Sequence, residues 1–190
     1  INGVKETLSG TTTATTTSGT PLGYLSSGGY TYGGTTWQGF NGYISNLRVV
    51  KNQVLYPNNF TPSTTPLLPI TGTSLLTNQS NKFVDNSPNN YALTLTNQPT
   101  ISPAVPFSTQ YVANTPYYST YFNGSTDYLT FTPGSIAQFG TGDFTVECWI
   151  YPTATLSTQY IVDMRDATHT TGWALAFGVN TSGCLGWYAQ

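Results

Sequence analysis

The sequence predicts an all-β protein, an antiparallel β-sandwich of the jelly-roll type. Short segments rich in β-branched and aromatic residues recur along the chain, and Gly, Pro and Asn separate them, which is typical of strands joined by turns. No helical periodicity of useful length appears, since the best candidate, residues 134–139, would make a single turn. Many short strands without helices favour a sandwich over the other fold classes.

The expected strands are runs of apolar, β-branched or aromatic residues bounded by turn residues. In chain order they are Ile1–Leu8, Leu22–Leu25, Gly42–Val50, Ser74–Thr77, Tyr91–Thr96, Tyr128–Phe131, Phe144–Tyr151, Gln159–Asp163, Trp173–Val179 and Cys184–Ala189. The threonine-rich stretch 10–20 lies between the first two, and we expect it to be a strand that leads into a loop.

The clearest strand is the segment FTVECWIY, residues 144–151, because it alternates between two faces. One face suits a core and comprises Phe144, Val146, Cys148 and Ile150. The other face comprises Thr145, Glu147, Trp149 and Tyr151. We therefore expect a central strand with the first set buried, and a second face that is either partly exposed or a binding surface.

The segment 42–50 departs from strict alternation. Its apolar residues Ile44, Leu47 and Val49 fall out of phase by one residue. An extra residue in one strand of an antiparallel pair restores the phase, so we expect a β-bulge near Ser45–Asn46.

Charged residues are rare. They make up 6% of the chain while hydrophobic residues make up 38%, so Thr, Ser, Asn and Gly take the place of charges, as is typical of extracellular and virion β-proteins. The five Lys and Arg residues are scattered singly and the net charge is -2, which argues against a nucleic-acid partner. No apolar run reaches the roughly 18 residues of a spanning helix, so we expect no membrane insertion.

Several motifs resemble a known family. INGVKE and FNGYISNLRVVKN resemble the closing strands of LamG-like jelly-roll modules in the concanavalin A-like lectin and glucanase superfamily. Four further motifs resemble the opening half of the same module and occur in the order that the family has. They are DNSPNNYALTLTNQPT, YFNGSTDYLTF, GTGDFTVECWIYP and GWALAFGVNTSGCLGWY. The stretches YPNNFTPSTTPL and TSLLTNQSNKFVDNS are most similar to tandem modules of marine phage virion proteins and of some bacterial surface proteins. Together these motifs cover most of the chain.

The resemblance implies parts of two tandem modules. Residues 1–60 would be the C-terminal half of one module, 61–71 a proline-rich connector, and 72–190 the N-terminal part of a second module. The segment INGVKETL reads like the middle of a strand, so we expect the chain to be part of a longer polypeptide. A complete module would need a middle strand pair of about 20–30 further residues.

Two expectations follow from this arrangement. Residues 1–60 and 72–190 should not pack as one ordinary domain within a single chain. The alternative is that neighbouring copies complete each other's sandwich. Either way the apolar faces and unpaired strand edges need covering, so we expect the chain to belong to a larger assembly.

The superfamily also suggests glycoside hydrolysis, which needs two carboxylates across the scissile bond. Glu147 has Thr145 and Trp149 as its neighbours on the same strand face, so the paired constellation is absent there. The single histidine, His169, lies in the polar segment RDATHTTG beside no candidate nucleophile. We therefore expect no enzymatic activity, with a fragment of a secreted glycoside hydrolase as the alternative.

Carbohydrate sites stack aromatic rings on sugars and hold the sugar hydroxyls with amides, hydroxyls and a few carboxylates. The candidate carbohydrate-binding residues are Glu147, Trp149, Tyr151, Trp187 and Tyr188. Packing within the core or on the strand surface is the alternative for these aromatic residues. It is the favoured interpretation for Trp173, whose face also carries Leu175 and Phe177.

Calcium is the one cofactor that the resemblance suggests, because many LamG-type modules bind it at the rim of the sandwich. The candidate ligands are Asp127, Asp163 and Asp166, in turn-like segments, and solvated turn residues are the alternative interpretation. Cys148 and Cys184 are expected to be buried thiols, each on its own strand, with a disulfide between them as the alternative.

The sequence thus predicts a non-enzymatic, structural and carbohydrate-binding (lectin-like) module. Its setting would be a virion fibre or decoration protein, or another repetitive extracellular protein, at the virion surface or outside the cell. The expected partners are glycans or other copies of the same protein. A purely architectural surface or fibre protein without a ligand is the alternative, beside the hydrolase fragment.

Overall fold

The computed structural model of the 190-residue chain describes most of it. The described residues are 1–5, 22–26, 30–32, 35–107, 117–134, 138–154, 158–166, 172–179 and 184–189. The threonine-rich stretch 10–20 and His169 lie outside the described residues, and so do the expectations made for them.

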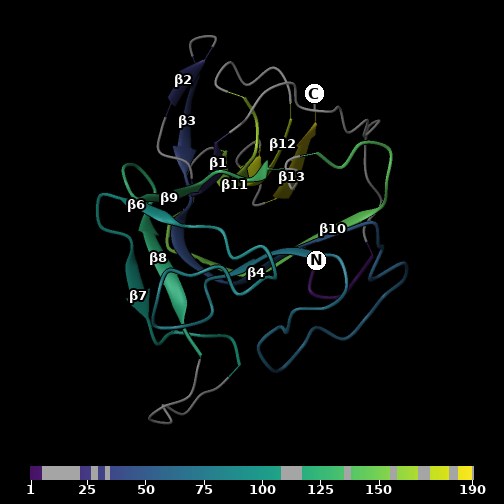
Figure 1. Ribbon diagram of the computed structural model, residues 1–190. Coiled ribbons are helices and arrows are strands. Elements are labelled where there is room, and N and C mark those ends of the chain that lie inside the picture. Colours follow the sequence, from purple (N-terminus) through teal and green to yellow (C-terminus); the bar gives the residue numbers. More distant parts are fainter. Residues whose placement is uncertain are drawn as a thin grey trace.

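Two β-sheets pack face to face as a sandwich that is not closed into a barrel (Figure 1). In the eight-stranded sheet β13-β12-β11-β1-β9-β6 form one path, β3 also pairs with β11, and β2 pairs with β3. Its strands are β1 (Gly23–Leu25), β2 (Tyr30–Tyr32), β3 (Thr35–Gly39), β6 (Thr94–Thr96), β9 (Tyr128–Phe131), β11 (Gln159–Asp163), β12 (Trp173–Val179) and β13 (Cys184–Ala189).

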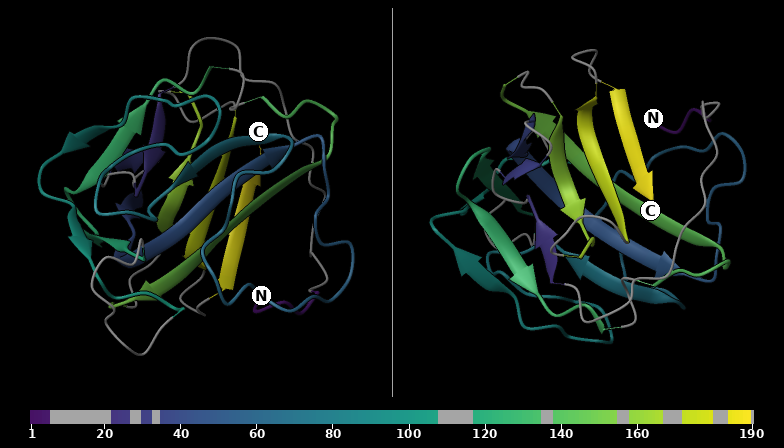
Figure 2. Two further views of the ribbon diagram at one scale, coloured as in Figure 1. Left: turned by 60° about the horizontal axis from the view of Figure 1, so that its bottom comes forward. Right: turned by 90° about the horizontal axis from the view of Figure 1, so that it is seen from above.

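The five-stranded sheet has the order β10-β4-β8-β7, with β5 also paired to β4. Its strands are β4 (Asn41–Lys51), β5 (Thr73–Thr77), β7 (Thr100–Ser102), β8 (Ser119–Asn123) and β10 (Phe144–Pro152). Figure 2 shows β4 and β10 in one layer and the strands near the C-terminus in the other. The described pairings are antiparallel except for β3 with β11. The predicted fold class is confirmed.

The core lies between the sheets and draws on both. Fully buried apolar side chains include Leu25, Ile44, Leu47, Phe122, Leu129 and Ile161. A stack of aromatic rings joins the two layers. The ring centroids of Phe144 of β10 and Trp187 of β13 are 5.0 Å apart, and those of Trp187 and Trp173 of β12 are also 5.0 Å apart. Phe139 stacks on Phe144 at 4.1 Å and completes the group.

The strands β1, β4, β5, β9, β11, β12 and β13 lie where the sequence predicts strands, within a few residues. The expected first strand is wrong for its described part, because residues 1–5 contain a turn with positive φ at Asn2 and Gly3. Of the expected strand Tyr91–Thr96, only the last three residues, β6, are extended. The strands β2, β3, β7 and β8 are additions that the sequence analysis did not place.

The longest strand, β4, organises the five-stranded sheet. β10 pairs with it along nearly its whole length on one side, while β8 and β5 pair with its two halves. The register shifts between Ser45 and Arg48, where two residues of β4 face the single residue Cys148 of β10. Asn46, at this shift, has a φ of 54°. The predicted bulge near Ser45–Asn46 is therefore confirmed.

The bulge residue Asn46 is fully buried and its side chain joins three segments. Its amide oxygen accepts hydrogen bonds from the backbone N–H of Leu67 at 2.8 Å and from Nε2 of Gln79 at 2.7 Å. Its Nδ2 donates to Oγ of Ser45 at 2.8 Å. Gln79 also donates to the carbonyl oxygen of Leu67 at 2.6 Å. The proline-rich stretch is thereby held against the sheet.

Strand β10 shows the alternation that the sequence predicts. Phe144, Val146, Cys148 and Ile150 are partly buried and pack against the core cluster. The expectation of a central strand is wrong, however, because within the described residues β10 pairs with β4 alone and forms an edge. An edge strand has one open flank, which explains why its core-facing side chains are only half-buried.

The segments on either side of the connector share both sheets. β4 pairs with β8 and β10 of the later segment, and β1 pairs with β9 and β11. The expectation that 1–60 and 72–190 do not pack together in one chain is therefore wrong. The physical reason is that the closing strand β4 finds its antiparallel neighbours within the same chain. The origin of the two segments in two tandem modules stays a prediction.

Replacing Asn46 tests the bulge. Asn46→Ala places alanine at a positive φ, which asparagine tolerates better. It also removes the amide oxygen that accepts hydrogen bonds from the buried N–H groups of Leu67 and Gln79. We expect the free energy of unfolding to fall by about 2–4 kcal/mol in urea titrations followed by tryptophan fluorescence.

The control is Asn46→Gly, which tolerates the φ of 54° but also lacks the amide. It should lose less stability than the alanine variant and still fall below the native protein. A glycine variant as stable as the native protein would show that the amide network contributes nothing.

Candidate functional site

Three tyrosines form a row across the outer face of the five-stranded sheet. Tyr43 of β4 is directly opposite Tyr151 of β10 on one side and Tyr121 of β8 on the other. The ring centroids of Tyr43 and Tyr121 are 5.1 Å apart, and those of Tyr43 and Tyr151 are 6.2 Å apart. Tyr151 is 68% exposed, while Tyr43 and Tyr121 are half-buried. The row therefore presents aromatic rings to solvent across three adjacent strands.

A pocket of about 330 Å³ lies beside this row. Its lining residues are Tyr43, Ser45, Ala104, Val105, Pro106, Ser119, Trp149, Ile150 and Tyr151. None of these side chains carries a charge. Trp149 stands at its edge, where Phe107 packs on it edge to face at 5.8 Å. Aromatic rings next to an apolar hollow with a few hydroxyls have the composition of a ligand site for an uncharged molecule.

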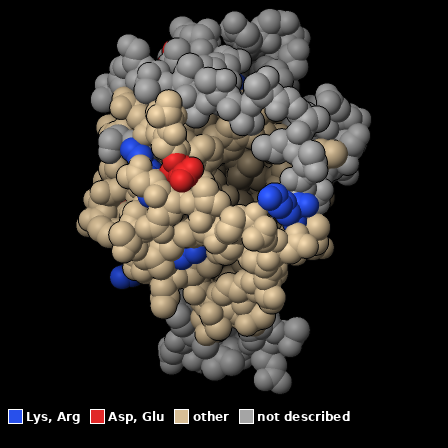
Figure 3. Space-filling model, turned by 90° about the vertical axis from the view of Figure 1, so that its right-hand side faces the viewer, with Lys and Arg blue, Asp and Glu red and all other residues tan. Residues whose placement is uncertain are grey.

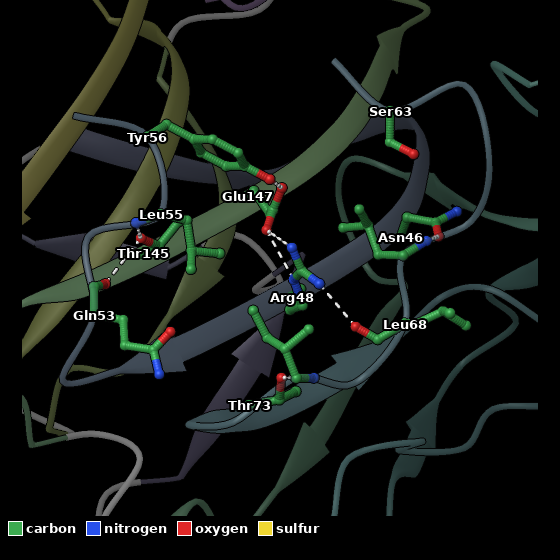
Figure 4. A network of polar contacts seen from close by, with 12 residues as sticks. Asn46, Arg48, Gln53, Leu55, Tyr56, Ser63, Leu68, Thr73, Thr145 and Glu147 are labelled. Atoms are coloured by element: carbon green, nitrogen blue, oxygen red, sulfur yellow. Dashed lines mark hydrogen bonds and ion pairs between the residues drawn. The ribbon is translucent and has the colours of Figure 1, made fainter. Parts of the chain in front are cut away.

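The other half of the outer face of β10 is already covered by the chain (Figure 4). Glu147 accepts from Arg48, with Nη2 at 2.6 Å and Nε at 2.8 Å from Oε1, and from the hydroxyl of Tyr56 at 2.9 Å. Arg48 also donates to the carbonyl oxygen of Leu68 at 2.7 Å. Thr145 donates to the carbonyl oxygen of Gln53 at 3.1 Å. Glu147 therefore clamps the segment after β4 rather than facing the pocket.

Burial and the neighbouring carboxylate act on Tyr56 in the same direction. Desolvation is the larger cause and the hydrogen bond to Glu147 the next, and together they raise the pKa of the Tyr56 phenol above its ordinary value. The phenol stays protonated at neutral pH and keeps donating to the carboxylate.

The predicted carbohydrate-binding residues do not gather in one place. Trp149 and Tyr151 lie together at the pocket. Trp187 belongs to the aromatic stack of the core, as does Trp173, for which core packing was the favoured interpretation. Tyr188 lies in the other sheet, 6.0 Å from the ring of Tyr160. The structure thus distributes the five candidates over different parts of the fold, and their role in carbohydrate binding stays a prediction.

Two residues of the tyrosine row, Tyr43 and Tyr121, were missed by the sequence analysis. Each lies next to a core residue, Ile44 or Phe122, in a strand that alternates locally. That alternation predicts an outward side chain, but only the register of β4 with its neighbours brings the tyrosines opposite one another.

The three aspartates considered for calcium have other roles or lie apart from a shared site. Asp163 is buried and paired with Arg165, with Oδ2 2.7 Å from Nη2. Asp127 accepts from the backbone N–H of Gln98 at 3.2 Å. Among the residues that the structure describes, no three His, Cys, Asp or Glu side chains gather as metal ligands. The structure does not bring Asp127, Asp163 and Asp166 together as a metal site.

The two cysteines are not joined by a disulfide. Cys148 belongs to β10 of the five-stranded sheet, and Cys184, which is exposed, begins β13 of the other sheet. The expectation of a buried thiol is therefore wrong for Cys184. Burial, with a smaller contribution from the charge of Glu147, raises the pKa of the Cys148 thiol to about 12.

Charge contributes little to the surface. Figure 3 shows one face of the molecule, on which Lys, Arg, Asp and Glu side chains are few and most of the described surface is uncharged. Within the described residues, no helix is long and apolar enough to cross a membrane. A ligand of the tyrosine row and its uncharged pocket would thus be recognised through ring stacking and hydrogen bonds rather than through charge.

No family model, curated protein or solved structure matches this chain. The fold is an all-β sandwich of two antiparallel sheets, and the tyrosine row with its pocket is a candidate ligand site on the described surface.

Because Glu147 holds the segment after β4 and does not line the pocket, its substitution should lower stability without changing ligand affinity. Glu147→Gln removes the ion pair with Arg48, whose side chain is 7% exposed, while the shape of the strand is kept. We expect the free energy of unfolding to fall by about 1–3 kcal/mol, because a charge-assisted hydrogen bond is lost and a nearly buried guanidinium is left without its counter-ion.

The same variant should bind any ligand of the tyrosine row with unchanged affinity, since Glu147 does not line the 330 Å³ pocket. Urea unfolding and isothermal titration of one preparation measure both quantities. A variant of native stability that fails to bind would contradict both halves of this prediction.

The thiols should react differently. The thiolate is the nucleophile, so at pH 8 Cys148, with its pKa near 12, should resist iodoacetamide in the native protein. Cys184 is exposed and should be alkylated. Mass spectrometry of proteolytic peptides after labelling in buffer and in urea distinguishes the two. Equal labelling of both cysteines in buffer would refute the prediction.

Proposed function

We propose that this protein is a non-enzymatic carbohydrate-binding module, and that the row formed by Tyr121, Tyr43 and Tyr151 is its binding surface. The observation that carries the proposal is a row of one exposed and two half-buried tyrosines beside an uncharged pocket. Aromatic faces stack on the C–H groups of pyranose rings, and phenol hydroxyls hydrogen-bond to sugar hydroxyls. Its members come from adjacent strands, with neighbouring ring centroids 5.1 and 6.2 Å apart, so the row extends far enough to contact more than one sugar of a chain.

The setting of the module is part of the same proposal. A low charge, abundant Thr, Ser and Asn, and motifs that resemble LamG-like modules of the concanavalin A-like superfamily support a repetitive extracellular or virion-surface protein. In that setting the sandwich would display the tyrosine row to glycans while its other surfaces contact copies of the same protein or further parts of the polypeptide.

The contacts of Glu147, the candidate carboxylate, do not favour a hydrolase. Both oxygens of Glu147 accept hydrogen bonds from neighbouring side chains, and the residue supports the segment after β4. A general acid or nucleophile needs an oxygen that faces the scissile bond. We therefore propose binding without hydrolysis.

Substitution of Tyr151 tests the proposal. Its side chain is 68% exposed, so Tyr151→Ala should fold and should lose a stacking surface. On an array of neutral and acidic oligosaccharides we expect the native protein to bind at least one glycan, and the variant to bind it about tenfold more weakly.

The matched control is Tyr128→Ala, which removes a half-buried tyrosine from the eight-stranded sheet, where it packs on Tyr24 at 5.7 Å. This variant should keep the affinity of the native protein. Absence of binding to every glycan of the array would favour the purely architectural role and sink the proposal. So would equal affinity of the native protein and Tyr151→Ala.

A further inference from the structure

The pocket beside the tyrosine row is more apolar than a site for sugar hydroxyls alone. Ala104, Val105 and Pro106 form one wall, and Ile150 and Trp149 of β10 border the other. A sugar hydroxyl placed against these apolar side chains would lose hydrogen bonds to water that they cannot replace, which carries a cost. A methyl group placed there would gain by leaving water. The lining therefore suits an apolar substituent on a sugar that stacks on the tyrosines.

Two buried hydroxyls give this pocket a polar feature. Ser45 and Ser119 are each 2% exposed and both line it. Oγ of Ser45 donates to the carbonyl oxygen of Tyr118 at 2.9 Å and accepts from Asn46, which uses one of its two acceptor positions. Oγ of Ser119 donates to the carbonyl oxygen of Ser102 at 3.5 Å. Since both hydroxyl hydrogens point to backbone carbonyls, what the serines offer a ligand is an acceptor.

An apolar wall together with a buried acceptor defines a substituent that has a methyl group and one N–H donor. We propose that the pocket holds the acetamido group of a neutral, chitin-type glycan of N-acetylated sugars while the sugar ring lies on Tyr43 and Tyr151. The acetamido methyl packs against Val105 and Trp149, and its N–H donates to a serine oxygen. This inference rests on the proposed carbohydrate binding and adds the class of sugar.

The absence of charge in the lining favours an N-acetylated sugar over related sugars that carry an ammonium or a carboxylate group. An ammonium in place of the acetamido group would enter an apolar pocket without a carboxylate to receive it. A carboxylate on the sugar would meet no Lys or Arg among the lining residues. Bacterial wall glycan shares the acetamido group but carries a carboxylate-bearing ether on alternate sugars, so the neutral polymer is the better fit.

The test compares ligands that differ at one position. Chitotetraose and cellotetraose share the β-1,4-linked backbone, with an acetamido group in one and a hydroxyl in the other. Isothermal titration of the whole protein should give an affinity for chitotetraose at least about tenfold higher. The fully deacetylated tetraose and a tetrasaccharide from bacterial wall glycan should both bind more weakly than chitotetraose.

A pocket-filling variant locates the effect. Ala104 is exposed, so Ala104→Leu should fold and should occupy the space of the acetamido methyl. We expect it to lose the preference for chitotetraose while its affinity for cellotetraose is kept. The matched control is Ala92→Leu, at an exposed position just before β6 of the other sheet, which should keep the preference.

The outcomes separate this inference from the proposal on which it rests. Equal affinity of chitotetraose and cellotetraose, or a preference that survives Ala104→Leu, would overturn the acetamido pocket and leave carbohydrate binding standing. Binding of other glycans through Tyr151 but of neither tetraose would do the same. Binding of no glycan at all would overturn both.

Discussion

The bulge in β4 is the constraint on which the rest of the sheet depends. A strand of eleven residues that pairs with three others can bury one face only if its side chains keep phase along its whole length. The bulge adds one residue to β4 at Asn46, whose φ is positive. Ile44 before the bulge and Leu47 after it therefore both point into the core. Without it one half of β4 would turn its apolar side chains to solvent, and either Tyr43 before the bulge or Arg48 after it would point inward.

The same bulge divides the outer face into two parts with different uses. Beyond it, the buried amide of Asn46 and the guanidinium of Arg48 hold the proline-rich stretch through Leu67 and Leu68, and that part of the sheet is covered. Before it, Tyr43 stands between the tyrosines of its two neighbour strands and stays accessible. The covered support and the proposed binding surface thus lie side by side on one strand, and the contacts of the covered half help to fix the register of the open half.

Sequence reasoning succeeded where the information is local. The alternation of residues 144–151 predicted which side chains of β10 meet the core, and the phase change in 42–50 predicted the bulge, because the side-chain period of a strand is two. It failed where the answer depends on which strand pairs with which. Neither the edge position of β10 nor the ion pair of Glu147 with Arg48, 99 positions away, is visible in either segment alone. The tyrosine row required both pairings of β4 at once.

The geometry of the row also distinguishes packing from binding. Cross-strand aromatic pairs stabilise a sheet by roughly 0.2–1 kcal/mol, and the half-buried pair of Tyr43 and Tyr121 has that role. Tyr151 contributes less to stability, since it lies on an edge strand with 68% of its surface in water. An exposed ring that adds little to folding, placed at the mouth of an apolar pocket, gains most from a ligand that covers it. Stability and affinity should therefore respond in opposite order: Tyr121 matters more for folding, and Tyr151 more for binding.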